Sequence, residues 1–345
     1  MPTALTHESI FSCICEETLG FRFGEPQRPE SDSLCVVVPI LRETASKRQY
    51  ITLSETDKVD VVDTGSINRM KVTNLSTENV FIRSGTIFKG QTQERALMRS
   101  AVAFAGRDME VEVRCIHASR SIRPGAKTSH AGYTPIEFDS GVYRTGFRPA
   151  DQSAVWARAS SVSSAYHVMS SSRISSGRSA SPRVPTAQVP ASTPGAFDVA
   201  IPRVDDLTSH YERFTKTFDD VTARIRWVEN QAGFALLTDN GVETIETFDS
   251  PLSWKAIHED AVKRLGSRVL GKDEEGVFDF KPERAKALIR KVLAGKFTEN
   301  LIYEHRPSNG ELHVLILGLS GDRYVGEVVE VDGRVIHLML IRQSP

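Results

Sequence analysis

The sequence has no hydrophobic run long enough to cross a membrane as a helix, which takes about 20 apolar residues. Its longest apolar runs, such as Val36–Leu41 and Val314–Leu319, have the length of strands. The first residues, MPTALTHESIFSCICEE, become acidic early and lack a basic segment followed by an apolar one. They therefore make a poor secretory signal, and we expect a protein without membrane contact.

Cysteine is also scarce, since the 345 residues contain only Cys13, Cys15, Cys35 and Cys115. Four scattered cysteines cannot form the disulfide framework of a secreted domain, which favours free thiols in a reducing cytoplasm. Cys13 and Cys15 form a Cys-x-Cys pair, but no nearby Cys or His pair completes the four ligands of a zinc site. We interpret this pair as buried strand cysteines and expect no metal.

Neither sign of charge is in excess, because 43 Lys and Arg residues oppose 44 Asp and Glu residues. A nucleic-acid ligand requires a clear surplus of cations, so we do not expect one. The sequence also lacks a Gly-x-Ser-x-Gly elbow, a His-Glu-x-x-His pair and a Rossmann glycine fingerprint followed by an acid. It therefore leaves open whether the protein is an enzyme, and it contains no pattern that calls for a cofactor.

The first 150 residues or so are rich in short β-branched runs separated by polar or glycine-containing turns. The gaps are too short for crossover helices, which predicts mostly antiparallel pairing. In the expected strand Glu110–His117, Val111, Val113 and Cys115 lie on one face, and the residues between them lie on the other. The expected strands are Val36–Pro39, Gln49–Leu53, Val59–Val62, Met70–Val72, Val80–Arg83 and Glu110–His117.

The remainder alternates helical and hairpin patterns. Asp151 is placed to cap a helix, and Ser250-Pro251 opens another that runs to about Arg268. Asn-Gly and Asp-Gly pairs at Asn240-Gly241 and Asp332-Gly333 indicate hairpin turns. Further expected elements are helices over Asp206–Arg226 and Pro282–Ala294, strands over Ala232–Thr238 and Val242–Phe248, and a terminal hairpin of Tyr324–Val331 with Arg334–Ile341. Together these patterns predict an α+β fold, with an antiparallel β-rich N-terminal part packed against C-terminal helices and a terminal β-hairpin.

The best candidate site is the segment Lys89–Arg95, which reads KGQTQER. A glycine-bearing turn lets backbone N–H groups approach an anion, and Lys89, Gln93 and Arg95 could hold anionic oxygens. A phosphate or ribose would suit this chemistry, although the glycine spacing is not that of a P-loop. The alternative is an ordinary β-turn with surface charges.

Cys115, His117 and Arg120 form a second candidate cluster. Cys115 and His117 lie two residues apart and so share a face of a strand, where a neighbouring cation lowers the pKa of a thiol. Cys115 is then a candidate nucleophile; the alternative is a small buried apolar residue. His337 lies in a closing apolar strand and is either a core histidine or a base.

Several segments resemble, in their order along the chain, the ARG and rhodanese-phosphatase superfamily associated protein domain, an ARPP-type domain. The similarity runs from about Ser33 to the C-terminus, apart from a Ser/Pro-rich insert. Where that family usually has Glu and Trp, this sequence has His117 and Ser121. The segments that carry the similarity are Ser84–Arg95, Val111–His117 with Arg120, Asp151–Trp156, Gly233–Ala235, Thr247–Pro251 and Val335–Leu338.

The resemblance implies one integrated domain that includes both halves of the chain. Residues 1–32 form an N-terminal extension with a candidate first strand, and residues 33–169 form the β-rich part. Residues 170–197 are a Ser/Pro/Arg-rich insert with four prolines and little to bury, so we expect it to be flexible. Residues 198–345 form the α/β C-terminal part of the same domain.

The resemblance also associates the chain with NAD and ADP-ribose metabolism. Our first hypothesis is a protein that binds, and as a further option processes, a nucleotide or ADP-ribose-related ligand. Lys89, Gln93 and Arg95 would bind it with His117 and Arg120 nearby, and we expect them to share one pocket with Cys115 and His337. The alternative is a non-enzymatic module that binds a protein partner, with the insert as a regulatory loop.

Overall fold

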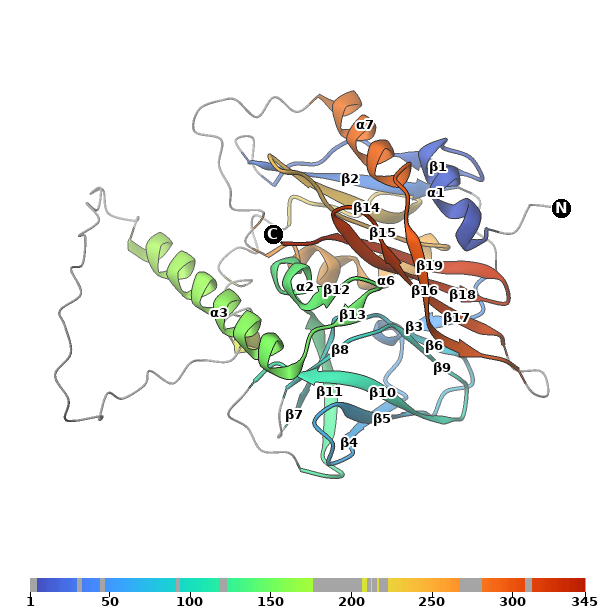
Figure 1. Ribbon diagram of the computed structural model, residues 1–345, viewed down its shortest axis with the longest axis vertical. Coiled ribbons are helices and arrows are strands. Elements are labelled where there is room, and N and C mark those ends of the chain that lie inside the picture. The colour runs from blue at the N-terminus through green and yellow to red at the C-terminus, as the bar shows by residue number, and fades with distance from the viewer. Residues whose placement is uncertain are drawn as a thin grey trace.

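The computed structural model describes residues 5–29, 33–43, 47–90, 94–117, 123–175, 207–209, 212, 216, 223–266, 268, 281–307 and 312–344. Two β structures dominate this part of the chain, an eight-stranded sheet and a closed six-stranded barrel below it in Figure 1. Helices cover both faces of the large sheet. The α+β prediction is confirmed.

The large sheet is antiparallel throughout, in the order β1-β2-β14-β15-β19-β18-β17-β16. Its central strands are buried on both faces because a separate hydrophobic cluster covers each face. The strands are β1 (Phe21–Phe23), β2 (Cys35–Arg42), β14 (Gln231–Thr238), β15 (Gly241–Phe248), β16 (Thr298–His305), β17 (Val314–Ser320), β18 (Tyr324–Val331) and β19 (Arg334–Arg342).

Helices α1 (His7–Cys15) and α7 (Pro282–Leu293) pack on one face of this sheet, where Figure 1 shows them at its top. Helices α6 (Pro251–Lys263) and α2 (Ile136–Val142) pack on the other face, toward the barrel. Helix α3 (Gln152–Ser175) lies beside α2 and the barrel strand β10.

The barrel is closed in the order β10-β5-β4-β11-β7-β8. Alternate residues of β10 are buried, including Val111 and Val113, which join a hydrophobic cluster with the apolar residues of β5 and β8. The predicted alternation in this strand is therefore confirmed. The barrel strands are β4 (Val59–Asp63), β5 (Arg69–Asn74), β7 (Thr86–Gly90), β8 (Arg95–Leu97), β10 (Asp108–Cys115) and β11 (Lys127–Tyr133).

A small three-stranded sheet joins the barrel to the large sheet. Its strands are β3 (Ile51–Thr52), β6 (Val80–Ile82) and β9 (Ala101–Ala103), and the β3–β6 pair is parallel. Phe81 of β6 stacks edge-on against Phe248 of the large sheet, with 5.6 Å between ring centroids. One hydrophobic cluster therefore runs from the barrel into the sheet. A short pair, β12 (Tyr143–Arg144) and β13 (Arg148–Pro149), follows α2.

Local turn and cap signals are reproduced closely. Asp332 and Gly333 have φ of 50° and 70°, the positive pair that a type I′ hairpin turn requires between β18 and β19. The Ser250 hydroxyl accepts a hydrogen bond from the Leu252 N–H, 3.3 Å away, and Pro251 begins α6. Asp151 Oδ1 accepts a bond from the Ala154 N–H at 2.8 Å and caps α3.

Helix α1 corrects the interpretation of Cys13 and Cys15 as strand cysteines. Thr6 and Ser9 form a reciprocal cap that starts the helix, and Ile10, Cys13 and Ile14 lie on its buried face. The spacing of three and four residues between these buried side chains is that of a helix, whereas the strand prediction assumed a spacing of two.

Other expectations about the middle of the chain fall outside the described residues. These include most of the Asp206–Arg226 helix and residues 176–197 of the insert; α3 extends through Ser175, so residues 170–175 are helical. In the part of the chain that the structure describes, no helix is both long and apolar enough to span a bilayer.

Candidate functional site

Arg95 closes one end of the barrel. Its side chain is buried, and its Nη2 donates to Asp63 Oδ2 at 2.9 Å. Its Nη1 donates to the carbonyl oxygens of Ser66 and Arg69 at 2.7 and 3.1 Å. Arg95 therefore ties the turn between β4 and β5 to the start of β8. These bonds occupy both Nη groups of the guanidinium that the sequence predicts to hold a ligand.

Lys89 lies at the same barrel end, near the end of β7. Its Nζ is 2.7 Å from Glu212 Oε1 and 4.0 Å from Glu94 Oε1. The neighbouring Gly90 is required for packing, since a Cβ there would be 2.7 Å from the backbone oxygen of Lys127. Gln93 lies outside the described residues, as does Arg120.

Cys115 is the register partner of Arg95 across the β8–β10 pair. Its thiol is buried and donates to the backbone oxygen of His117, 2.9 Å away. The Gln152 side chain holds the Cys115 backbone through bonds of 3.1 and 2.7 Å. Burial raises the pKa of the Cys115 thiol, although the His117 carbonyl and Trp156 partly oppose this. The residue at neutral pH is thus a protonated thiol, whereas a nucleophile must be a thiolate.

We predict that iodoacetamide alkylates Cys115 of the folded protein at neutral pH at least about tenfold more slowly than the half-buried Cys15, because the reagent requires an accessible thiolate. Mass mapping of peptides after timed quenching measures both rates, with the urea-unfolded protein as the control in which the rates converge. Equal rates in the folded protein would contradict the assignment of Cys115 as an inert packing residue.

His337 lies away from the barrel end, in the core where the barrel meets the large sheet. Its Nε2 is 3.1 Å from Glu246 Oε1, and its ring packs against Phe81 and Phe248 at 5.1 and 4.7 Å between centroids. The structure thus brings Lys89, Arg95, Cys115 and His117 to one barrel end and places His337 elsewhere.

Glu246 is the centre of a buried charge network that sequence reasoning did not find. Its carboxylate accepts bonds from Arg83 Nη2 at 2.9 Å and Arg264 Nη1 at 2.8 Å. Arg264 Nη2 also donates to Asp139 Oδ2 at 2.8 Å. All four side chains are at most 2% exposed, so this network joins the barrel, α2, α6 and the sheet and does not face solvent.

The first residues of the Ser84–Arg95 segment lie where the barrel packs against the large sheet. The Ser84 hydroxyl donates to Glu327 of β18 at 2.5 Å. Gly85 has φ +78°, and a Cβ there would lie 2.5 Å from Thr134 Oγ1. This part of the segment therefore packs the barrel against the sheet.

An open pocket with three cationic side chains among its six lining residues lies where the segment before β3 meets the turn of the terminal hairpin. Its volume is about 580 Å³. We call it the cationic pocket; its walls are Lys47, Arg48, Gln49, Val331, Asp332 and Arg334.

Two of its cations are held in place by carboxylates. Arg48 makes a two-pronged pair with Glu55, with bonds of 2.8 and 2.9 Å, and also contacts Ser253 Oγ at 3.3 Å. Arg334 donates through Nη2 to Asp249 Oδ2 and, at 3.3 Å, to the backbone oxygen of Lys47. These anchors fix the guanidinium groups in the pocket wall.

Asp249 connects the two anchors. It is buried and accepts a bond from the Tyr50 hydroxyl at 2.7 Å, and that hydroxyl accepts one from Ser253 Oγ at 3.0 Å. Burial, followed by the Asp249 carboxylate, raises the pKa of Tyr50 well above its ordinary value. A continuous polar chain therefore runs from Arg48 through Ser253 and Tyr50 to Asp249 and Arg334.

Arg42 adds buried positive charge near this site. It is 4% exposed, its guanidinium carbon lies 4.9 Å from the centroid of the Phe21 ring, and its Nε and Nη1 have no hydrogen-bond partner in the described part of the chain. Burial lowers the pKa of Arg42, Asp249 raises it, and the charge of Arg334 lowers it further. An anion bound close by would add to the stabilisation that Asp249 gives this buried charge.

Sequence reasoning missed this pocket because its two walls are almost the full chain apart. Lys47-Arg48 and Arg334 were ordinary surface cations in the sequence. The Asp332-Gly333 turn was predicted correctly from its sequence and belongs to one wall, but its sequence contains no sign of a pocket.

A family model described as ARG and Rhodanese-Phosphatase-superfamily-associated Protein domain matches residues 20–341. The match begins before Ser33 and includes β1, the barrel and the whole large sheet. No curated protein and no solved structure matches the chain.

Proposed function

The chain belongs to the family of ARG and Rhodanese-Phosphatase-superfamily-associated Protein domains, and from this premise we propose that it binds a phosphate-bearing small molecule of the nucleotide or ADP-ribose-related class. The binding site in this proposal is the cationic pocket. The barrel end, with Arg95 and Cys115, has a structural role instead.

The observation that supports the proposal is the side-chain content of the pocket wall. Lys47, Arg48 and Arg334 line it, and Asp332 is its one acidic member among the described residues. Guanidinium groups held in a fixed orientation match phosphate oxygens in pairs. The volume of about 580 Å³ lies within the range of small-molecule sites.

The proposal is limited to binding. The one candidate nucleophile that the sequence suggested, Cys115, lies on the barrel strand β10 and does not line the cationic pocket.

We expect wild-type protein to bind ADP-ribose, and Lys47→Glu to weaken that binding by about tenfold or more, because it reverses a charge in the wall. Lys47 is exposed, so the substitution leaves the core intact. Lys296→Glu is the matched control, since Lys296 is also exposed. It precedes Thr298, which pairs with Ser320 at one end of β17, whereas Val331 of the pocket wall pairs with Val314 at the other end.

Isothermal titration calorimetry with ADP-ribose, NAD and ADP measures the affinities, and melting temperatures confirm that both variants fold. Absence of binding by the wild-type protein to all three compounds, or equal affinities of the two variants, would refute the proposal.

The alternative, a module for a protein partner, has one observation in its favour. Strand β16 is at the edge of the large sheet, and its Leu301 and Tyr303 side chains are 56% and 40% exposed. Exposed apolar residues on a sheet edge are typical of strand-addition surfaces. Failure of every phosphate compound to bind would favour this alternative.

A further inference from the structure

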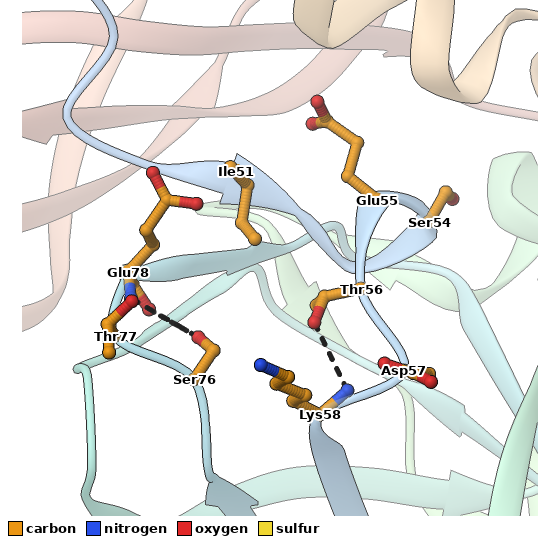
Figure 2. A pocket seen from close by; sticks show the side chains of 9 residues that line it. All are labelled: Ile51, Ser54, Glu55, Thr56, Asp57, Lys58, Ser76, Thr77 and Glu78. Carbon is orange, nitrogen blue, oxygen red and sulfur yellow. Dashed lines mark hydrogen bonds between the residues drawn. The ribbon is translucent and has the colours of Figure 1, made fainter.

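A second pocket lies directly beyond the Arg48–Glu55 pair. Its volume is about 600 Å³. It is formed by residues 53–58, which are the short 3-10 helix η1 (Leu53–Glu55) and the loop after it, and by the loop 75–79 between β5 and β6. Figure 2 shows the Ile51 side chain between Glu55 and Glu78, with Lys58 extended toward Ser76. We call it the hydroxyl pocket.

Hydrogen-bond acceptors dominate the hydroxyl pocket. It has carboxylates from Glu55, Asp57 and Glu78 and a single cation, Lys58. Its hydroxyl groups come from Ser54, Thr56, Ser76 and Thr77. Such a wall repels phosphate and binds the O–H groups of a sugar, which donate to carboxylates and exchange hydrogen bonds with hydroxyls.

Hydrogen bonds order the backbone around the hydroxyl pocket. The buried Asn74 amide donates to the backbone oxygens of Glu78 and Ala103 at 2.8 and 2.9 Å, and its Oδ1 accepts from the Ser76 hydroxyl at 2.7 Å. On the other wall the Thr56 hydroxyl accepts from the Lys58 N–H at 3.1 Å. The Asn74 bonds fix the 75–79 loop against β9, so this wall loses little conformational entropy when a ligand binds.

Two carboxylates remain available to a ligand. Neither Asp57 nor Glu78 has a side-chain ion-pair or hydrogen-bond partner among the described residues, whereas Glu55 is bound to Arg48. Asp57 and Glu78 come from the two different loops, so they can receive hydroxyl groups from two sides of one ring.

The Arg48–Glu55 pair joins the two pockets into one bipartite site. Arg48 lines the cationic pocket and Glu55 lines the hydroxyl pocket, and bonds of 2.8 and 2.9 Å connect them. Resting on the proposed phosphate site, we infer that the ligand is a sugar phosphate or a nucleotide sugar, whose phosphate lies in the cationic pocket and whose sugar hydroxyls lie in the hydroxyl pocket.

The opposite charges of the two pockets fix the orientation of such a ligand. A phosphate in the hydroxyl pocket would face Asp57 and Glu78, while a sugar in the cationic pocket would bring no negative charge to Lys47, Arg48 and Arg334. Only one of the two orientations satisfies both walls.

The test uses two probes, inorganic pyrophosphate and ribose 5-phosphate, and the double variant Asp57→Asn/Glu78→Gln. Removing two negative charges makes the site more attractive to any anion, so pyrophosphate should bind the variant as tightly as wild type or more tightly. Ribose 5-phosphate should bind about tenfold more weakly despite this electrostatic gain, because neutral amide oxygens accept hydrogen bonds from its hydroxyl groups less strongly than carboxylates do, and each amide has only one acceptor oxygen.

The control is Asp322→Asn, which removes an exposed charge at the β17–β18 turn and should change neither affinity. Calorimetry gives the affinities, and melting temperatures show whether the variants fold. If ribose 5-phosphate binds the double variant as well as or better than wild type, the sugar assignment is wrong and the phosphate site stands. If wild type binds neither probe, the phosphate site itself fails, and the sugar assignment fails with it.

Discussion

Glu246→Ala is expected to lower the free energy of unfolding by about 3–5 kcal/mol, because it leaves two buried guanidinium groups without their shared anion. Arg83 and Arg264 both donate to this carboxylate, and each is essentially inaccessible to water. Neither can move to solvent without separating the barrel from the large sheet. Urea unfolding followed by circular dichroism measures the loss.

Glu110→Ala is the matched control. Glu110 also pairs with an arginine, Arg69 at 2.9 Å, but both side chains are more than half exposed. Exposed pairs of this kind contribute about 0–1 kcal/mol, so the control should stay close to wild type. A loss for Glu246→Ala that is no greater than that of Glu110→Ala would show that the network does not hold the two β structures together.

The same carboxylate makes stability depend on pH in a defined direction. Burial raises the pKa of Glu246, but Arg83 and Arg264 outweigh burial and bring the pKa well below its ordinary value of 4.5. A carboxyl group with a lower pKa in the folded state stabilises the fold above its unfolded pKa, and this contribution is lost as the pH falls below that value.

Wild-type protein should therefore lose stability as the pH falls from about 5 to about 3, and Glu246→Gln should lose less over the same interval. Asp139 acts in the opposite direction, since burial raises its pKa despite Arg264. Comparing the two proteins at each pH isolates the contribution of Glu246. Identical pH profiles would contradict a low pKa for Glu246 in the fold.

Arg95→Ala is the second substitution with a large expected effect, again a loss of about 3–5 kcal/mol in unfolding free energy. It leaves the buried Asp63 carboxylate without its cation and removes the donors to the carbonyl oxygens of Ser66 and Arg69. Arg95→Lys should recover little of the loss, since one ammonium cannot bridge two strands as a planar guanidinium does.

Arg69→Ala serves as control, because Arg69 is at the same barrel end but is 67% exposed. Urea unfolding compares the three variants with wild type. The sequence predicts that Arg95 binds the ligand, whereas the structure shows it closing the barrel. Stability and ADP-ribose affinity, measured on the same variant, distinguish these two roles. If Arg95→Ala kept wild-type stability and lost ADP-ribose binding, Arg95 would be a ligand residue and the barrel-closing role would be wrong.

Short-range signals were enough to predict most of the secondary structure. The Asp332-Gly333 turn, the Ser250-Pro251 helix start and the Asp151 cap each depend on backbone conformations and hydrogen bonds within a few residues. The alternation in β10 likewise predicted which of its residues are buried. The α+β class follows from such local patterns, because each predicts its own element. The Cys13–Cys15 segment failed since a short apolar run fits both a strand and a helix.

Contacts between distant segments decided the chemistry. Arg83 and Glu246 are separated by 163 residues, and Lys47 and Arg334 by 287, yet each pair meets in the folded chain. A charged residue looks the same in the sequence whether it closes a barrel, as Arg95 does, or lines a pocket, as Arg334 does. Its partners and its exposure to water determine its role, and those depend on how the barrel and the sheet pack. The residue types were therefore visible in the chain, while their roles emerged only when folding removed some of them from water and left others in the wall of an open pocket.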